Sequence, residues 1–195
     1  MIRVQQQDFD PAEEYRALRN SGSGTGAIAT FTGLVRDSGD LSGVTGLFLE
    51  HYPGMTEQVI EGLVHEASQR WDVRDARIIH RVGSLALSDQ IVFVGVCSAH
   101  RGDAFAACEF IMDALKTSAP FWKKEITGDT EHWVEQKAAD LDRTQSWDSL
   151  RNFVARRRAI PNTPSEKRFE YVRVRLGSAI LGSAHFRKGC SELLA

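Results

Sequence analysis

The chain has 195 residues, 42% of them hydrophobic and 26% charged, and a formal charge of -2, which is the composition of an ordinary globular protein. No apolar run reaches the roughly 18 to 20 residues that a membrane span needs, and the first residues contain no apolar signal core, so we expect a cytoplasmic protein. The three cysteines have neither C-x-x-C nor zinc-ligand spacing, so the sequence predicts no metal site and no cofactor.

Charge divides the chain into two parts. Residues 1–137 carry 13 basic and 20 acidic side chains, a net charge of -7, whereas residues 138–195 carry 11 basic and 6 acidic side chains, a net charge of +5. Such an asymmetry is typical of segments with different roles. We therefore predict a folded domain over 1–137 and a basic C-terminal extension over 138–195 whose structure the sequence leaves open.

The first third of the chain predicts one helix and two strands. Asp10 and Pro11 are a helix cap and a proline at the first helical position, which predicts a helix over 10–19. The segments 27–35 and 44–52 are strand-like and are separated by a polar loop. We predict that these two strands form a hairpin with a long loop.

The middle of the chain alternates between both element types. Apolar residues at three- and four-residue steps predict an amphipathic helix over 59–71 that packs on a sheet. Strands follow over 76–82 and 90–98, and the second is so uniformly apolar that we expect both of its faces to be covered. A helix over 103–117 is predicted to be capped by Asp103 and ended by Pro120. The fold class is therefore a mixed α/β (α+β) domain, and a basic helix over 146–158 and a strand over 169–175 are expected beyond it.

Two cationic groups flank the helix over 103–117. His100 and Arg101 lie between the strand and the helix start, where free backbone N–H groups favour an anion. Lys116, Lys123 and Lys124 surround the helix end, and lysines crowded by other cations or partly desolvated can act as a base or nucleophile. The alternative for all five, and for Arg36 after an earlier strand, is an ordinary solvated side chain. His51, His80 and Cys97 are interpreted as structural.

Several strings together resemble the catalytic, large subunit of molybdopterin synthase, the MoaE family. The resemblance covers about residues 1–137, and its strings are Thr32-Gly-Leu-Val-Arg36, Leu49-Glu-His-Tyr-Pro-Gly-Met-Thr-Glu57, His80-Arg-Val-Gly83, Val94-Gly-Val-Cys-Ser-Ala-His-Arg101, Ala104-Phe105 and Met112-Asp-Ala-Leu-Lys-Thr-Ser-Ala-Pro-Phe-Trp-Lys-Lys-Glu125. This resemblance implies an α/β hammerhead fold with a mixed or antiparallel sheet and flanking helices. It also implies a homodimer within a heterotetramer, with a small ubiquitin-like sulfur-carrier subunit bound at each end.

The resemblance also implies a reaction and its residues. The carrier's C-terminal Gly-Gly bears a thiocarboxylate, and two sulfur transfers convert cyclic pyranopterin monophosphate to molybdopterin in molybdenum cofactor biosynthesis, without a bound metal. By position, Lys116 and Lys123 match the catalytic lysines, although their individual roles stay open. The positions that match substrate-binding residues are Arg36, His100, Arg101, Lys124, Glu125 and Lys137.

Three features depart from the family pattern. Leu34 stands where members can have a lysine, so one cationic contact is missing, and Lys137 stands where some members have an arginine contributed by the neighbouring subunit. Lysine keeps that charge but loses the forked geometry of a guanidinium. Residues 138–195 match nothing in the family, and we predict that they are dispensable for the chemistry.

Two other functions compete with the sulfurtransferase. One is a non-catalytic phosphate- or nucleic-acid-binding module that uses the basic residues 156–158, and the other is an assembly module that has lost catalysis. The acidic charge of 1–137 and the lack of interleaved aromatic and basic residues argue against nucleic acid. The presence of both Lys116 and Lys123 argues against the loss of catalysis.

Overall fold

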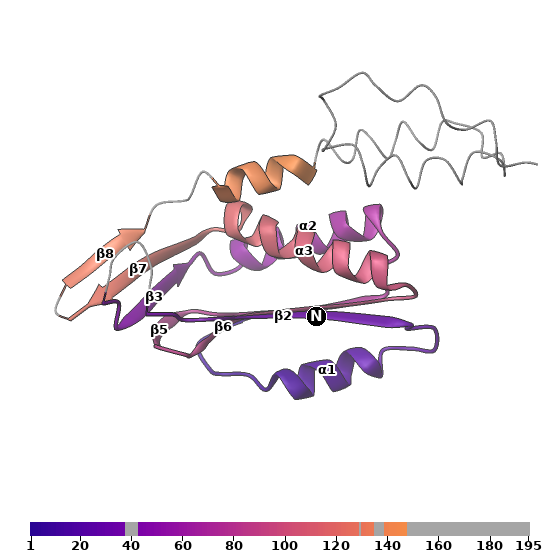
Figure 1. Cartoon of the computed structure of the whole chain (residues 1–195), viewed down its shortest axis with the longest axis horizontal. Coiled ribbons are helices and arrows are strands. Elements are labelled where there is room, and N and C mark those ends of the chain that lie inside the picture. The colour runs from indigo at the N-terminus through magenta and orange to yellow at the C-terminus, as the bar shows by residue number, and fades with distance from the viewer. Residues whose placement is uncertain (38–42, 129, 135–138, 148–195) are drawn as a thin grey trace, which may run out of the picture. The chain divides into compact units, whose positions relative to one another are not determined.

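The computed structural model describes residues 1–37, 43–128, 130–134 and 139–147 of the chain (Figure 1). Its elements, in chain order, are β1 (Ile2–Gln5), α1 (Pro11–Arg19), β2 (Ala27–Leu34), β3 (Gly46–His51), α2 (Met55–Arg70), β4 (Asp75–Arg81), β5 (Gly83–Ala86), β6 (Gln90–Ser98), α3 (Arg101–Ser118), β7 (Phe121–Thr127), β8 (Thr130–Val134) and a helix over 139–147. This mixture confirms the predicted α+β class.

The first sheet has the strand order β1-β4-β6-β2. The β1–β4 pair is parallel, and the other two pairs are antiparallel. Figure 1 shows α2 and α3 over one face of this sheet and α1 against the other. The expected coverage of both faces of β6 is confirmed, because Val94 packs in the core beneath α2 and α3 while Phe93 packs with Leu18 of α1.

The second sheet has the order β5-β3-β7-β8, and all of its pairs are antiparallel. Figure 1 shows this sheet beside the end of α3 that leads into β7. Val35, which follows β2, packs with Leu47 and Leu49 of β3 and with Leu85 of β5 in a small apolar cluster. This cluster ties the second sheet to the edge of the first.

Local sequence features explain where α1 begins, how α2 packs and where α3 ends. The Asp10 side chain accepts a hydrogen bond from the Ala12 backbone N–H and caps α1, as the sequence predicts. Helix α2 confirms the predicted amphipathic helix and buries Ile60 and Leu63 against the first sheet. Helix α3 stops at Ser118 because Pro120 disfavours the helical conformation of the residue before it and cannot donate a backbone hydrogen bond.

Two expectations about local structure are wrong. The segments 27–35 and 44–52 do not form a hairpin, because β2 pairs with β6 and β3 pairs with β5 and β7 in the other sheet. The cap of α3 is His100 and not Asp103, which lies within the first turn. The residues after Pro120, for which the sequence predicted no helix or strand, form the strand β7.

The helix over 139–147 lies beyond the predicted domain boundary at residue 137. By internal contacts it belongs to the compact unit Met1–Leu150. The domain division therefore stays a prediction, and the expected strand over 169–175 lies outside the described residues, as does nearly all of the expected basic helix over 146–158. No helix among the described residues is long and apolar enough to cross a membrane.

Candidate functional site

Two of the predicted site lysines flank the junction between α3 and β7. Lys116 lies in the last turn of α3, and Lys123 lies in β7 just after the turn at Pro120. The Lys116 side chain is half exposed, and its Nζ lies 3.5 Å from Oδ1 of Asp140. The Lys123 side chain is 37% exposed, so both amines are accessible to a ligand at this junction.

Successive side chains of β7 point to opposite faces of the second sheet, which separates the charged residues 123–125. Lys123 and Glu125 point to one face of the second sheet, where Nζ of Lys123 lies 3.4 Å from Oε1 of Glu125. Glu125 is only 2% exposed, and its strand partner is the buried Leu47. A carboxylate buried against an apolar cluster needs a cationic partner, so Glu125 restrains the Lys123 ammonium at this face.

Lys124 points to the opposite face of the same sheet. Its Nζ lies 3.0 Å from Oε2 of Glu131, 4.6 Å from the ring centre of Trp133 and 5.3 Å from that of Phe48. These contacts hold the ammonium by an ion pair and by cation–π attraction. Within one chain, Lys124 therefore does not share a face with Lys123 and Glu125.

The other predicted cationic group lies at the far end of α3. His100 and Arg101 are exposed at the start of α3. The His100 side chain makes no capping hydrogen bond to the first turn of the helix. Arg101 and Lys116 are 15 positions apart in one helix, which corresponds to about 22 Å. The helix therefore separates the predicted substrate-binding residues His100 and Arg101 from Lys116 within a single chain.

Arg36 lies nearer to the lysine end than to the His100 end. It follows Val35, whose backbone N–H donates to the Asp89 carbonyl just before β6 begins. Strand β6 leads into α3, and the helix packs back over the strand. The start of β6 and the end of α3 therefore lie toward the same end of the first sheet. Lys137, the remaining predicted residue, lies outside the described residues.

A buried histidine supports the start of β7. The His80 ring stacks on the Phe121 ring, with 3.8 Å between their centres, and its Nδ1 lies 2.9 Å from the Arg81 carbonyl oxygen. Burial lowers the pKa of His80 to about 4, so the ring is neutral near pH 7. This environment agrees with the structural interpretation of His80. The ring contacts Phe121, which precedes Lys123 by two positions in β7.

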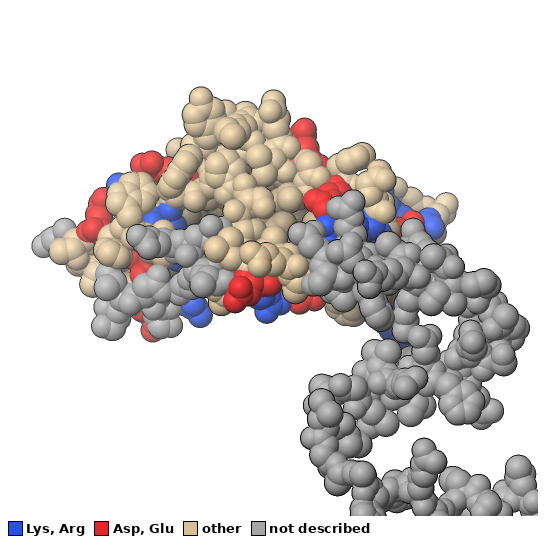
Figure 2. Space-filling model, turned by 90° about the horizontal axis from the view of Figure 1, so that it is seen from above, with Lys and Arg blue, Asp and Glu red and all other residues tan. Residues whose placement is uncertain are grey.

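The charged surface is mixed. Figure 2 shows lysine and arginine atoms scattered among acidic ones on the described part of this face, without one continuous basic patch. Within the described ranges, no group of three or more His, Cys, Asp or Glu residues is placed to hold a metal ion. At the α3–β7 junction, the described side chains offer the amines of Lys116 and Lys123 and the buried carboxylate of Glu125.

Sequence reasoning missed two side chains that contact α3. Asp140 pairs with Lys116, and Trp147 packs on α3 through Phe110, from a segment that was assigned to the extension. An acidic residue 24 positions from Lys116 carries no pairing signal, because nothing in the sequence shows that the chain folds back there. The aromatic residue in the predicted basic helix was the available hint of a packed segment.

Comparisons with known proteins identify a family for the chain. The family model described as MoaE protein matches residues 4–118. A molybdopterin synthase catalytic subunit of Ralstonia nicotianae is 55% identical over 146 residues, covering 75% of this chain and 83% of that protein. The corresponding subunit of Pseudomonas aeruginosa is 51% identical over 147 residues, covering 75% and 98%.

Solved structures give the same result for the fold. The molybdopterin biosynthesis MoaE protein of Burkholderia ambifaria is 51% identical, with a TM-score of 0.63 over 73% of this chain and 96% of that chain. A molybdopterin synthase structure from Staphylococcus aureus is 31% identical, with a TM-score of 0.61 over 68% and 95%. A protein–protein complex of subunits 1 and 2 of molybdopterin-converting factor from Helicobacter pylori is 20% identical, with a TM-score of 0.59 over 70% and 91%, and shows the fold alone.

The fold and the sequence together define a catalytic subunit of the molybdopterin synthase class, an enzyme of molybdenum cofactor biosynthesis. The chain belongs to the MoaE family. The resemblance noted in the sequence is thereby confirmed.

Proposed function

We propose that this chain transfers sulfur from the thiocarboxylated C-terminal Gly-Gly of a small ubiquitin-like carrier subunit to cyclic pyranopterin monophosphate, which yields molybdopterin after two transfers. The observation that carries the proposal is the α3–β7 junction, which presents Lys116 and Lys123 as two accessible amines. Family membership supports the carrier as partner.

The two lysines supply the charge and proton handling that this reaction needs. When the carbonyl of the carrier terminus is attacked, an oxyanion forms, and an ammonium group placed beside it lowers the energy of that intermediate. The second amine moves protons as the cyclic phosphate opens and the pterin rearranges. Lys123 is restrained by the buried Glu125, which suits a group that must stay in one place during the reaction.

The phosphate requires a second group of cations. Arg36 and Arg101 offer forked guanidinium groups for charge-assisted hydrogen bonds, and His100 adds an imidazole. Because about 22 Å of α3 separates Arg101 from Lys116, one chain cannot bring both to one small substrate. We therefore propose a homodimer within a heterotetramer, in which Lys116, Lys123 and Arg36 of one copy meet His100, Arg101 and Lys137 of a second copy.

Lys124 differs from the other proposed substrate-binding residues. Its ion pair with Glu131 and its contacts with Trp133 and Phe48 favour a role in holding the second sheet together. The buried Glu125 likewise acts on the substrate through Lys123. We expect the protein to act in the cytoplasm.

A reconstituted assay tests the proposal. The full chain is mixed with a Gly-Gly carrier bearing a C-terminal thiocarboxylate and with cyclic pyranopterin monophosphate, and the pterin is analysed by mass spectrometry. We expect the pterin to gain two sulfur atoms with the wild type and none with Lys116→Ala or Lys123→Ala. Arg19→Ala, which removes an exposed cation at the end of α1, is the control for charge loss and is expected to keep full turnover.

Two outcomes would contradict the proposal. Wild-type protein that binds the carrier without sulfur transfer would indicate an assembly module. Lysine variants with wild-type turnover would show that the α3–β7 junction is not the reaction site. Circular dichroism of each variant separates loss of chemistry from loss of fold.

A further inference from the structure

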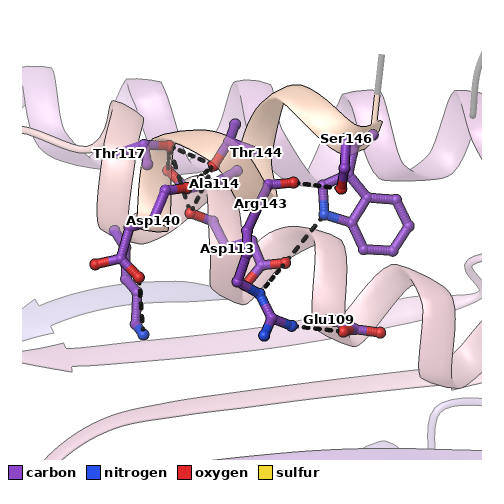
Figure 3. Close-up of polar contacts among 10 residues, drawn as sticks. Glu109, Asp113, Ala114, Thr117, Asp140, Arg143, Thr144 and Ser146 are labelled. Atoms are coloured by element: carbon purple, nitrogen blue, oxygen red, sulfur yellow. Dashed lines mark hydrogen bonds and ion pairs between the residues drawn. The ribbon is translucent and has the colours of Figure 1, made fainter. Parts of the chain in front are cut away.

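The helix over 139–147 is bound along α3 by a buried carboxylate. Figure 3 shows Asp113 of α3 beneath this helix, together with Arg143 and Glu109. Asp113 accepts a hydrogen bond from the Trp147 indole at 3.0 Å and lies 3.3 Å from Nε of Arg143. Arg143 also donates to Glu109 at 2.8 Å. A carboxylate that is 9% exposed and paired with two donors gives this helix one defined position on α3.

Further contacts hold the C-terminal half of the helix over 139–147. Oγ1 of Thr144 lies 3.0 Å from Oγ1 of Thr117, which Figure 3 shows on the same face of α3. The Trp147 ring packs edge-on against the rings of Trp71 and Phe110, with 5.7 and 5.8 Å between centres. These contacts pack residues 139–147 against α2 and α3.

The same geometry brings Asp140 to a proposed catalytic lysine. Asp140 lies in the first turn of the helix, and its Oδ1 is 3.5 Å from Nζ of Lys116. The Asp140 side chain is 26% exposed while that of Lys116 is 50% exposed, so the carboxylate is the more constrained partner. A lysine side chain has four rotatable bonds and reaches many positions when it is unrestrained. The carboxylate restricts the Lys116 ammonium to one part of that range.

The charge of Asp140 also limits what Lys116 binds. A carboxylate beside the ammonium repels a phosphate group, since like charges at short range oppose each other. A phosphate would therefore be bound by the guanidinium groups, while the Lys116 amine stays available for proton transfer. The ion pair thus favours proton transfer by Lys116 over the binding of a phosphate.

We propose that Asp140 is a positioning residue for Lys116, which orients the ammonium at the α3–β7 junction and keeps it from acting as a phosphate anchor. This inference rests on the proposed sulfur transfer. It runs against the expectation that residues after 137 are dispensable for the chemistry, because the positioning carboxylate belongs to that segment.

The test uses the full chain with the thiocarboxylated carrier and cyclic pyranopterin monophosphate. Asp140→Asn keeps the side-chain shape and removes the charge, and a partly exposed ion pair contributes little to stability, so the fold should persist. Since positioned acid–base groups contribute large rate factors, we expect kcat to fall about tenfold while KM for the pterin changes less than about twofold. Asp140→Glu should restore most of the lost kcat.

Asp142 provides a matched control. It lies in the same helix and is exposed, so Asp142→Asn removes the same charge without touching Lys116, and wild-type kinetics are expected. A second measurement is the acetylation of Lys116 relative to Lys123 by an N-hydroxysuccinimide ester, followed by mass spectrometry. Asp140→Asn should raise the relative labelling of Lys116, because the ion pair between its ammonium and the Asp140 carboxylate is lost, whereas Asp142→Asn should leave the ratio unchanged.

The outcomes separate this inference from the proposed function. If the wild type transfers sulfur and Lys116→Ala does not, but Asp140→Asn has wild-type kcat and labelling, the positioning role is wrong and the sulfur transfer stands. If the wild type transfers no sulfur, both are overturned. An equal loss in Asp140→Asn and Asp142→Asn would also refute the positioning role, because it would show a general effect of charge.

Discussion

Gly26 permits the close approach that places His100, and replacing it with alanine is expected to disturb both stability and activity. The Gly26 backbone N–H donates to the Ser98 carbonyl at the end of β6. A Cβ at position 26 would lie 2.3 Å from the Ala99 carbonyl oxygen and 3.2 Å from its carbon. Relief of this overlap requires a shift of about 1 Å in the backbone that leads directly to His100, because such contacts normally exceed about 3.4 Å.

The size of both effects follows from that shift. Overpacking of this kind costs about 1–3 kcal/mol, and each kcal/mol lowers the Tm of a chain of this size by about 2–4 °C. A misplacement of about 1 Å in a positioning group can reduce a rate about 100-fold. We therefore expect Gly26→Ala to melt at a lower temperature and to lose sulfur transfer at low substrate concentration, where binding of the phosphate limits the rate.

Gly102→Ala is the matched control for this prediction. Gly102 lies in the first turn of α3, two residues after His100, and a Cβ there would meet nothing within 4 Å. Alanine is also favoured over glycine in a helix, so the variant should be neutral or slightly stabilised. Thermal unfolding by circular dichroism and kcat/KM from the reconstituted assay are measured for both variants. An unchanged Gly26→Ala protein, or equal damage in Gly102→Ala, would refute the reasoning.

Three further predictions follow from burial and chain organisation. Burial lowers the pKa of His80 from 6.5 to about 4, so between these pH values the unfolded state binds more protons than the folded state. The free energy of unfolding should therefore fall by up to about 3 kcal/mol as pH falls from 6.5 to 4. In urea unfolding, His80→Phe should show a weaker dependence of this free energy on pH over the same range. Burial raises the pKa of the Cys108 thiol to about 11, so iodoacetamide at pH 8 should leave it unmodified until urea is added, as peptide mapping would show. Removal of residues 151–195 should leave sulfur transfer unchanged, since every proposed site residue and the helix over 139–147 precede this segment; a large loss of activity in a folded truncated chain would contradict this.

Local patterns predicted much of the fold. The apolar period of α2 and the uniform apolar run of β6 each have a cause within the segment itself, so their positions follow from the sequence. Strand pairing does not have such a cause. The strands β2 and β3 are neighbours in the chain, yet they join different sheets, because their partners β6 and β7 lie far away in sequence.

The site shows the same division between local and distant information. The residue types at positions 116 and 123–125 were found from the sequence and the family resemblance. The directions of the side chains at 123–125 depend on the strand β7, which the sequence did not predict. The opposite orientations of Lys123 and Lys124 follow once that strand is known. The contact between Lys116 and Asp140 depends on where the chain folds back after β8.

The length of α3 constrains how this protein can change over evolutionary time. The helix buries Ala104, Cys108, Ile111 and Leu115 on one face, and Lys116 follows directly after the last of them. Inserting or deleting one residue would rotate all later side chains by about 100° and shift them by about 1.5 Å along the axis. Leu115 and Lys116 could then no longer face the core and Asp140 respectively. Viable homologues should therefore tolerate point substitutions on the exposed side of α3 and exclude single-residue length variants within it.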